Sequence, residues 1–140
     1  MTEATVEQLR FLLDTNIVSH LVRHPQGVVR ERIAQVGEES VCISLLVAAE
    51  LRFGAAKKQS LRLTQQIDAI LSALQILPLE APVDVHYAEI RAGLETAGCP
   101  IGPNDLIIAA HARALGLTLV THNVVELSRV PGLQLENWLS

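Results

Sequence analysis

Aromatic residues are scarce in this chain of 140 residues, where two phenylalanines, one tyrosine and one tryptophan make up 3% of the sequence. A nucleic-acid site built by stacking bases on aromatic rings is therefore not expected. No apolar run approaches the roughly 20 residues needed to span a bilayer. The start, Met1-Thr2-Glu3-Ala4, lacks the basic and apolar segments of a secretory signal. We therefore expect a cytoplasmic protein with no membrane contact.

Cysteine is nearly absent. Cys42 lies in a predicted strand and Cys99 in a predicted loop, and these are the only two in the sequence. They could pair in principle, but two cysteines in a chain without an export signal favour reduced thiols. We assign no chemistry to either residue.

A basic excess is also missing, because eleven Lys and Arg residues face fifteen Asp and Glu residues, a net charge of −4. Domains coated for nucleic-acid binding commonly have pI values above about 9. An acidic metal site would still accept a polyanion, since each divalent cation adds two positive charges there. Two local basic clusters are present, each of which is either a solvated helix face or a binding surface. They are Arg52, Lys57, Lys58 and Arg62, and Arg23, Arg30 and Arg32.

The apolar residues that dominate the chain are Leu, Ile, Val and Ala, and hydrophobic residues reach 49%. This composition suits one domain, residues 1–140, with helices packed on a buried sheet. Residues 1–9 are expected to be a short N-terminal extension. Strands are predicted at 10–14, 41–44, 76–79, 117–121 and 133–135, the third and the last at edges of the sheet. Helices are predicted at 17–22, 28–36, 45–58, 61–74, 83–97 and 103–115, with a helical turn at 124–128.

This alternation of strands and helices predicts the α/β class, a parallel sheet covered by helices on both faces. In the helix at 45–58, Ser44 is expected to cap the start, and Leu46, Val47, Leu51 and Phe53 to face inward. In the helix at 103–115, Pro103 suits the first turn and Gly116 suits the residue after the last. Asp105 then lies in the first turn, where the helix dipole should keep its carboxylate ionised.

Four acids are singled out by their positions relative to the strands. Asp14 ends the first strand, Glu50 lies in the helix after the second, and Asp105 opens the helix before the fourth. Glu126, together with Asn123, follows the fourth strand. Ligands bind parallel sheets beyond the carboxyl ends of the strands, where the winding direction reverses. Converging carboxylates need a cation, and oxygen ligands suit Mg²⁺ or Mn²⁺ better than zinc. The pattern predicts metal-assisted phosphodiester hydrolysis, with no histidine needed as general base.

Each acid has a simpler alternative role. Asp14 could be only a helix N-cap, Asp105 could only satisfy the helix dipole, and Glu126 could be a solvated surface residue. Glu50 is harder to explain in this way, because an acid in a largely buried helix is costly unless it is paired or metal-bound.

The histidines are not expected to bind metal, since none is judged to have metal-ligand spacing to a second one. His111 and His122 are expected in the core or at the rim of the crevice. A haloacid-dehalogenase-like phosphatase would need an Asp where Asn16 stands. A response-regulator receiver would need an acid pair after the first strand, an Asp after the third and a late Lys, and these are missing.

Four motifs together resemble PIN-domain ribonucleases of the VapC toxin branch: Leu12-Leu13-Asp14-Thr15-Asn16, Ala49-Glu50-Leu51-Arg52-Phe53-Gly54-Ala55, residues 102–112 and Leu119-Val120-Thr121-His122-Asn123. The likeness runs from about Phe11 to Trp138. It implies a PIN-like three-layer α/β/α fold with a central parallel five-stranded sheet. It also implies a Mg²⁺- or Mn²⁺-dependent endoribonuclease that cuts structured RNA such as tRNA or rRNA. Attack by a metal-bound water then predicts products with 5′-phosphates.

The same resemblance implies the toxin half of a bacterial toxin–antitoxin pair. A VapB-like antitoxin would bind and inhibit the protein, DNA would be contacted only through that antitoxin, and the toxin would be a homodimer. The alternatives left open are a PIN nuclease that acts on DNA or in RNA processing, and a catalytically degenerate PIN interaction module.

Asp14, Glu50 and Asp105 match the three acids of the family and are the implied metal ligands and catalytic residues. The family's commonest fourth acid falls at Asn123, and Glu126 matches a variant with the acid three residues later. Thr15, Asn16, Ser44 and Asn123 are predicted to support the carboxylates by hydrogen bonds. The predicted RNA contacts are Arg52, Lys57, Lys58 and Arg62.

Overall fold

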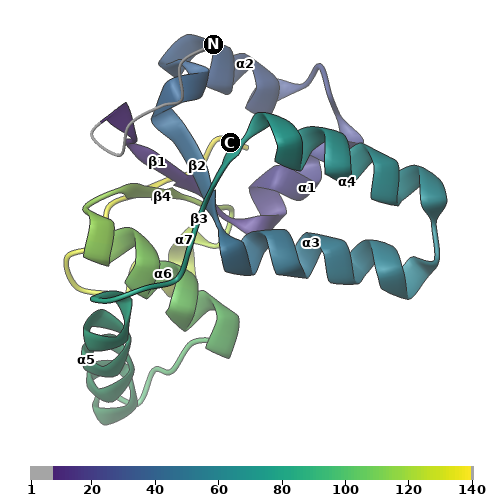
Figure 1. Ribbon diagram of the computed structural model, residues 1–140. Coiled ribbons are helices and arrows are strands. Elements are labelled where there is room, and N and C mark those ends of the chain that lie inside the picture. Colours follow the sequence, from purple (N-terminus) through teal and green to yellow (C-terminus); the bar gives the residue numbers. More distant parts are fainter. Residues whose placement is uncertain (1–7, 140) are drawn as a thin grey trace.

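The computed structural model describes residues 8–139, which are built around a five-stranded sheet (Figure 1). Its strands are β1 (Phe11–Leu13), β2 (Val41–Ser44), β3 (Gln75–Leu77), β4 (Thr118–Val120) and β5 (Leu135–Glu136). The helices are α1 (Thr15–Arg23), α2 (Val28–Val36), α3 (Leu45–Lys58), α4 (Leu61–Ala73), α5 (Val83–Thr96), α6 (Pro103–Leu115) and α7 (Val124–Leu127), with a 3₁₀ turn at Glu38–Ser40. The order of elements agrees with the alternation predicted from the sequence.

All strand pairs are parallel, and the strands lie in the order β3-β2-β1-β4-β5. Phe11 in the central strand lies opposite Val41 on one side and Thr118 on the other. The chain winds outward through β2 and β3 and then returns to β4 beside β1. The winding direction therefore reverses between β1 and β4, which is where a ligand crevice is expected in such sheets.

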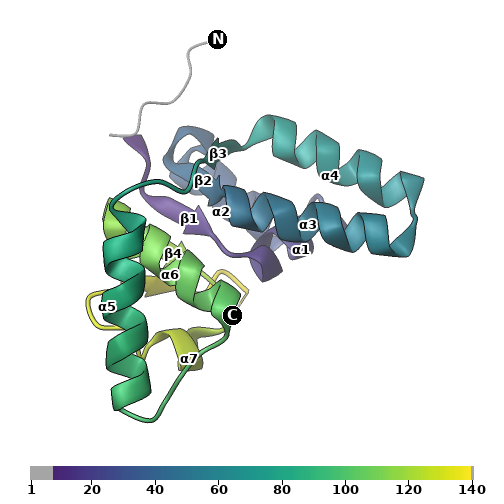
Figure 2. The same cartoon turned by 60° about the horizontal axis from the view of Figure 1, so that its bottom comes forward.

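The two winding directions place helices on both faces, because right-handed crossovers that run in opposite directions cover opposite faces. The connections β1 to β2 to β3 carry α1 to α4, and the return carries α5 and α6. In Figure 1 and Figure 2 the α3–α4 pair and the α5–α6 pair project in different directions from the sheet. The region beyond the carboxyl ends of β1 and β4 lies between these helical pairs.

The core forms where the sheet meets the helices. Leu12 and Leu13 of β1 are fully buried, as expected for a central strand covered on both faces. Ala109, Ala110 and Ala112 of α6 are also fully buried. Their small side chains let this helix approach the sheet closely, which fixes the helix that carries Asp105.

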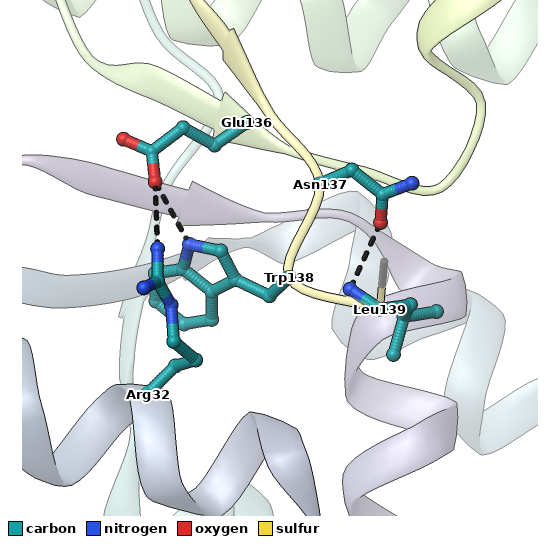
Figure 3. Close-up of polar contacts among 5 residues, drawn as sticks. All are labelled: Arg32, Glu136, Asn137, Trp138 and Leu139. Atoms are coloured by element: carbon teal, nitrogen blue, oxygen red, sulfur yellow. Dashed lines mark hydrogen bonds and ion pairs between the residues drawn. The ribbon is translucent and has the colours of Figure 1, made fainter.

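The C-terminal segment is held to α2 and β1 by an aromatic and polar cluster (Figure 3). Arg32 Nη2 and Trp138 Nε1 both donate to Glu136 Oε1, at 3.2 and 3.0 Å. The Arg32 guanidinium also lies over the Trp138 ring, 5.6 Å from its centroid. Trp138 is only 2% exposed and packs edge-on against Phe11, with ring centroids 5.4 Å apart. Trp138 therefore anchors this segment in the core.

Several expectations need correction. Phe53 was expected to face inward, but it is 66% exposed, because α3 projects beyond the sheet and only one side of it packs against α4. The last strand is Leu135–Glu136 rather than residues 133–135. Most of the expected extension at 1–9 lies outside the described residues, but Leu9 is buried in the core.

Other expectations hold. The helix starts at Ser44 and Pro103 and the left-handed Gly116 after α6 are confirmed. The cysteines are free, and burial raises the pKa of the Cys42 thiol to about 12. Among residues 8–139 no helix combines the length and apolar character needed to cross a membrane.

Candidate active site

Asp14 lies at the end of β1 and caps α1. Its main-chain N–H donates to Val120 O at 2.8 Å, which ties it to the end of β4. One carboxylate oxygen accepts the Thr15 N–H at 2.8 Å. The other accepts the Thr121 hydroxyl at 2.8 Å and the Asn16 amide at 3.4 Å. Asp14 is therefore both a helix cap and a rigidly oriented carboxylate, and it is only 3% exposed.

Glu50 lies in the second turn of α3 and is held from two neighbouring helices. Its Oε1 accepts the Thr15 hydroxyl of α1 at 2.7 Å, and its Oε2 accepts the Asn104 amide of α6 at 3.2 Å. Each oxygen thus has one donor. These contacts relieve the cost of an acid in a packed helix and hold its carboxylate at the junction of α1, α3 and α6.

Asp105 occupies the first turn of α6 and differs from the other acids. Within residues 8–139 no side chain or backbone group donates a hydrogen bond to its carboxylate. Burial raises its pKa above the ordinary value, and the like charges of Asp14, Glu126 and Glu50 raise it further. Burial and the neighbouring charges therefore act against the helix dipole, which was expected to favour the ionised form.

Asn123 and Glu126 stand together after β4. The helical turn expected at 124–128 is present as α7. Asn123 Nδ2 donates to Glu126 Oε2 at 3.2 Å, and the Asn123 N–H donates to Thr121 Oγ1 at 3.0 Å. Because the Glu126 charge also acts on Asp105, the fourth carboxylate belongs to the same cluster.

The four carboxylates thus share one electrostatic field. Burial is the main cause that raises the pKa of Asp14, and Glu50 raises it further, while the hydrogen bonds to Thr121, Thr15 and Asn16 oppose both. Oxygen donors of this kind fit Mg²⁺ or Mn²⁺. Within residues 8–139 no three of these side chains converge closely enough to hold an ion as they lie.

The predicted supporting residues fall into two groups. Thr15, Asn16 and Asn123 contact the carboxylates directly. Ser44 does not, because its hydroxyl accepts the Leu46 N–H at 3.2 Å and caps α3. It acts on the site only by fixing where the helix of Glu50 begins.

Two residues that hold the carboxylates were not predicted from the sequence. Thr121 donates to Asp14 across 107 positions of the chain, and Asn104 donates to Glu50 across 54. Asn104 directly precedes Asp105, and Thr121 is the first residue after β4. Their positions next to motif residues were the available signal, but Thr and Asn are too common at helix and strand ends for the residue type to single them out.

The predicted basic residues differ in their surroundings. Arg52 forms an ion pair with Asp68 of α4, with Nη1 and Oδ1 2.6 Å apart. Lys57 and Arg62 lie on either side of the α3–α4 turn. Lys58 instead lines a groove of about 180 Å³ between α1, α3 and α4, which Glu50 also lines. Of the four, Lys58 is therefore the one that shares a groove with a site carboxylate.

The histidines agree with expectation in one respect only. His111 is buried in the core, and His122 is exposed at the rim, where its backbone N–H donates to Asn16 Oδ1 at 3.0 Å. The statement that no two histidines have metal-ligand spacing was wrong. His20 lies in the last turn of α1, and His24, four positions later, is the residue that follows the helix; their ring centroids are 4.6 Å apart. They lie at the far end of α1 from Asp14.

Comparison with known proteins identifies the family. The PIN domain family model matches residues 11–133. The chain is 40% identical over 131 residues to the tRNA(fMet)-specific endonuclease VapC of Shigella flexneri, covering 93% of this chain and 98% of that protein. It is 39% identical over 130 residues to ribonuclease VapC2 of Rickettsia felis, covering 91% and 97% of the two chains.

A solved structure shows the same fold. The crystal structure of VapBC2 from Rickettsia felis, bound to a DNA fragment from its promoter, superposes with a TM-score of 0.87 at 36% identity. The match covers 93% of this chain and 99% of that one. With the parallel five-stranded sheet and the acids at its carboxyl edge, these matches show that the chain belongs to the PIN-domain family, in its VapC ribonuclease branch.

Proposed function

We propose that this protein is a Mg²⁺- or Mn²⁺-dependent endoribonuclease, the toxin of a bacterial toxin–antitoxin pair. One observation carries the proposal. Asp14, Glu50, Asp105 and Glu126 come from four separate elements and act on one another electrostatically at the reversal point of the sheet. A cluster of anions in a half-buried position costs stability, and a divalent cation offsets that cost.

A divalent cation bound among these oxygens would activate water and neutralise charge on the phosphate. The chain's own residues prepare the site for it. Thr121, Thr15 and Asn16 fix both oxygens of Asp14, so this carboxylate loses little freedom when it acts. Asp105 has no competing donor within the described residues, which leaves its oxygens available.

Glu50 and Glu126 complete the charge of the site. Thr15 and Asn104 hold Glu50 from opposite sides. Asn123 holds one oxygen of Glu126, so Asn123 orients the carboxylate and Glu126 supplies the charge. We assign the fourth acidic role to Glu126 for this reason.

The relatives support the choice of substrate and partner. One is named a tRNA(fMet)-specific endonuclease, and a neighbouring structure is a VapBC complex bound to promoter DNA. We therefore assign a structured RNA such as tRNA as substrate, a VapB-like antitoxin as inhibitor, and DNA contact through that antitoxin only. A homodimer in the cytoplasm is part of the same proposal.

The experiment is a substrate panel. Purified protein is incubated in Mg²⁺ with tRNA(fMet), with ribosomal RNA and with single-stranded DNA of the tRNA sequence, and the cut ends are mapped. We expect discrete cuts in RNA that leave 5′-phosphates, and no cuts by Asp105→Asn. Cutting of the DNA at an equal rate would assign the protein to the DNA-acting alternative. Absence of any cutting would assign it to the degenerate one.

A further inference from the structure

The groove beside Glu50 contains features that the carboxylate cluster does not use. Thr15, Ser19 and Arg23 line it from α1, while Glu50 and Lys58 line it from α3. Its floor is apolar and includes the buried Leu51 and Ile67. At about 180 Å³ it holds the volume of about six water molecules at ~30 Å³ each, which is ample for a phosphate group. The groove thus leads from the Glu50 carboxylate to two cations.

Arg23 and Lys58 are the two basic residues that line this groove. Within residues 8–139 neither forms an ion pair with an acid, whereas Arg52, six residues before Lys58 on α3, is paired with Asp68. Both side chains are exposed at the groove. Two unpaired cations against one acid give the groove a net positive charge in a chain whose net charge is −4. A local positive site of this kind favours an anion that lies next to the carboxylates.

Gly54 gives the groove its room. This glycine lies in the middle of α3, where glycine costs roughly 0.5–1 kcal/mol relative to alanine. A Cβ built on it would meet no atom within 4 Å, so packing does not require glycine here. Gly54 also lines the groove, and a side chain at this position would project into open space that a ligand needs.

We propose that Arg23 and Lys58 form a phosphate-binding subsite that holds the RNA backbone next to the scissile phosphate. The subsite rests on the proposed ribonuclease function and adds Arg23, which was not among the predicted RNA contacts. Arg23 comes from α1 and Lys58 from α3, and because they line one groove, both side chains bind the same phosphate. The apolar floor accommodates the neighbouring sugar. The nucleotide chain then runs from the groove toward Glu50 and Asp105.

The test measures RNA binding in a nuclease-inactive Asp105→Asn background. Fluorescein-labelled tRNA(fMet) is titrated with Arg23→Gln, with Lys58→Gln and with the double variant, at several salt concentrations. We expect each single variant to raise Kd about tenfold. The double variant should raise Kd by less than the product of the two single-variant increases, because both residues act on one phosphate. The slope of log K against log salt should fall by about 0.7, the value for one contact to a single strand.

Two further variants serve as controls. Arg91→Gln on α5 removes the same charge outside the groove and should leave Kd within about twofold. Gly54→Leu should block the groove and weaken RNA binding about tenfold, while its melting temperature equals or exceeds that of the parent. If the melting temperature of Gly54→Leu lies below that of the parent, its weaker RNA binding is assigned to misfolding. The test of the subsite then rests on the Arg23 and Lys58 variants.

The outcomes separate the subsite from the function. If the wild-type protein cuts RNA but the double variant binds tRNA(fMet) with parental affinity and salt slope, the subsite is wrong and the function stands. If the wild-type protein neither binds nor cuts RNA, both fail. If the double variant keeps RNA binding but loses a co-expressed antitoxin, the groove is a protein-docking surface and the phosphate assignment is wrong.

Discussion

Asp105→Asn is predicted to stabilise the metal-free protein, whereas Asp14→Asn is not. The Asp105 carboxylate accepts no hydrogen bond within the described residues, and Asp14, Glu126 and Glu50 all raise its pKa. The amide therefore removes repulsion and breaks no contact. Asp14, by contrast, accepts three hydrogen bonds. The side-chain amide of the Asp14→Asn variant could not accept hydrogen bonds from both the Thr15 N–H and the Thr121 hydroxyl, because its NH₂ group, which replaces one carboxylate oxygen, is a donor.

The size of each effect follows from these contacts. Asp105 is half-buried, so each like-charge interaction is screened and is worth roughly 0.2–1 kcal/mol. Three such interactions give a gain of about 0.6–3 kcal/mol, or a rise of about 2–12 °C in melting temperature for a chain of this size. In Asp14→Asn the same kind of relief is offset by an unpaired buried donor, which costs about 1–3 kcal/mol. Its net change should be zero or a loss.

The pH dependence has a defined sign. The folded-state pKa of Asp105 is raised above the unfolded value, so ionisation opposes folding. The penalty is present in full above the folded-state pKa and disappears as the pH falls through that pKa toward the unfolded value. The gain from Asp105→Asn should therefore be largest at pH 7, shrink in mild acid, and shrink in 1 M salt, where the Debye length is about 3 Å.

Urea unfolding in EDTA at pH 7 and in mild acid, with the two variants side by side, measures these changes. The m-values should be equal, so that the midpoints report stability alone. Equal destabilisation by both variants, or a gain for Asp105→Asn that is unaffected by salt, would refute the electrostatic account of the site.

Other positions give further expected outcomes. Glu126→Gln should slow RNA cleavage and weaken Mn²⁺ binding by about 10–100-fold, while Asn123→Ala costs less; the reverse ranking would assign the fourth position to Asn123. Thr121→Val should weaken Mn²⁺ binding by about 10–100-fold, and Thr121→Ser should restore it, as measured by calorimetry. Gly54→Ala should raise the free energy of unfolding by about 0.5–1 kcal/mol, and a loss would show that the groove geometry is wrong. Trp138→Ala should cost about 3–5 kcal/mol in urea unfolding, because it empties a packed site against Phe11.

The sequence allowed the strands and the acids to be predicted because both have strong local signals. Short apolar runs end at Asp14 and at Thr121, and in a parallel sheet all such ends lie at one edge. Pro103 and Gly116 marked the ends of α6 and so placed Asp105 in its first turn. The position of the cluster was therefore predictable from residue order alone.

The contacts that orient the cluster were not predictable in the same way. Thr121 and Asn104 reach carboxylates that are far away in sequence, and nothing local distinguishes them from ordinary capping residues. Phe53 was misplaced because periodicity shows that a helix has an apolar side but not whether another element covers that side. The helix dipole at Asp105 was a correct local argument, but burial and three neighbouring charges, which only the fold reveals, act in the opposite direction.

The most direct test of the central claim follows Mn²⁺ binding and RNA cleavage in the same samples. Mn²⁺ is titrated into wild type, Asp14→Asn, Asp105→Asn and Arg91→Gln, which serves as the control outside the site, and free Mn²⁺ is measured by electron paramagnetic resonance. Cleavage of tRNA(fMet) is followed in parallel. The account predicts that wild type and Arg91→Gln bind Mn²⁺ and that cleavage rises with occupancy. Both Asp variants should lose binding and cleavage together, and excess EDTA should abolish cleavage by wild type. Cleavage that persists in EDTA, or Mn²⁺ binding unchanged in both Asp variants, would contradict the assignment of these carboxylates as the metal site.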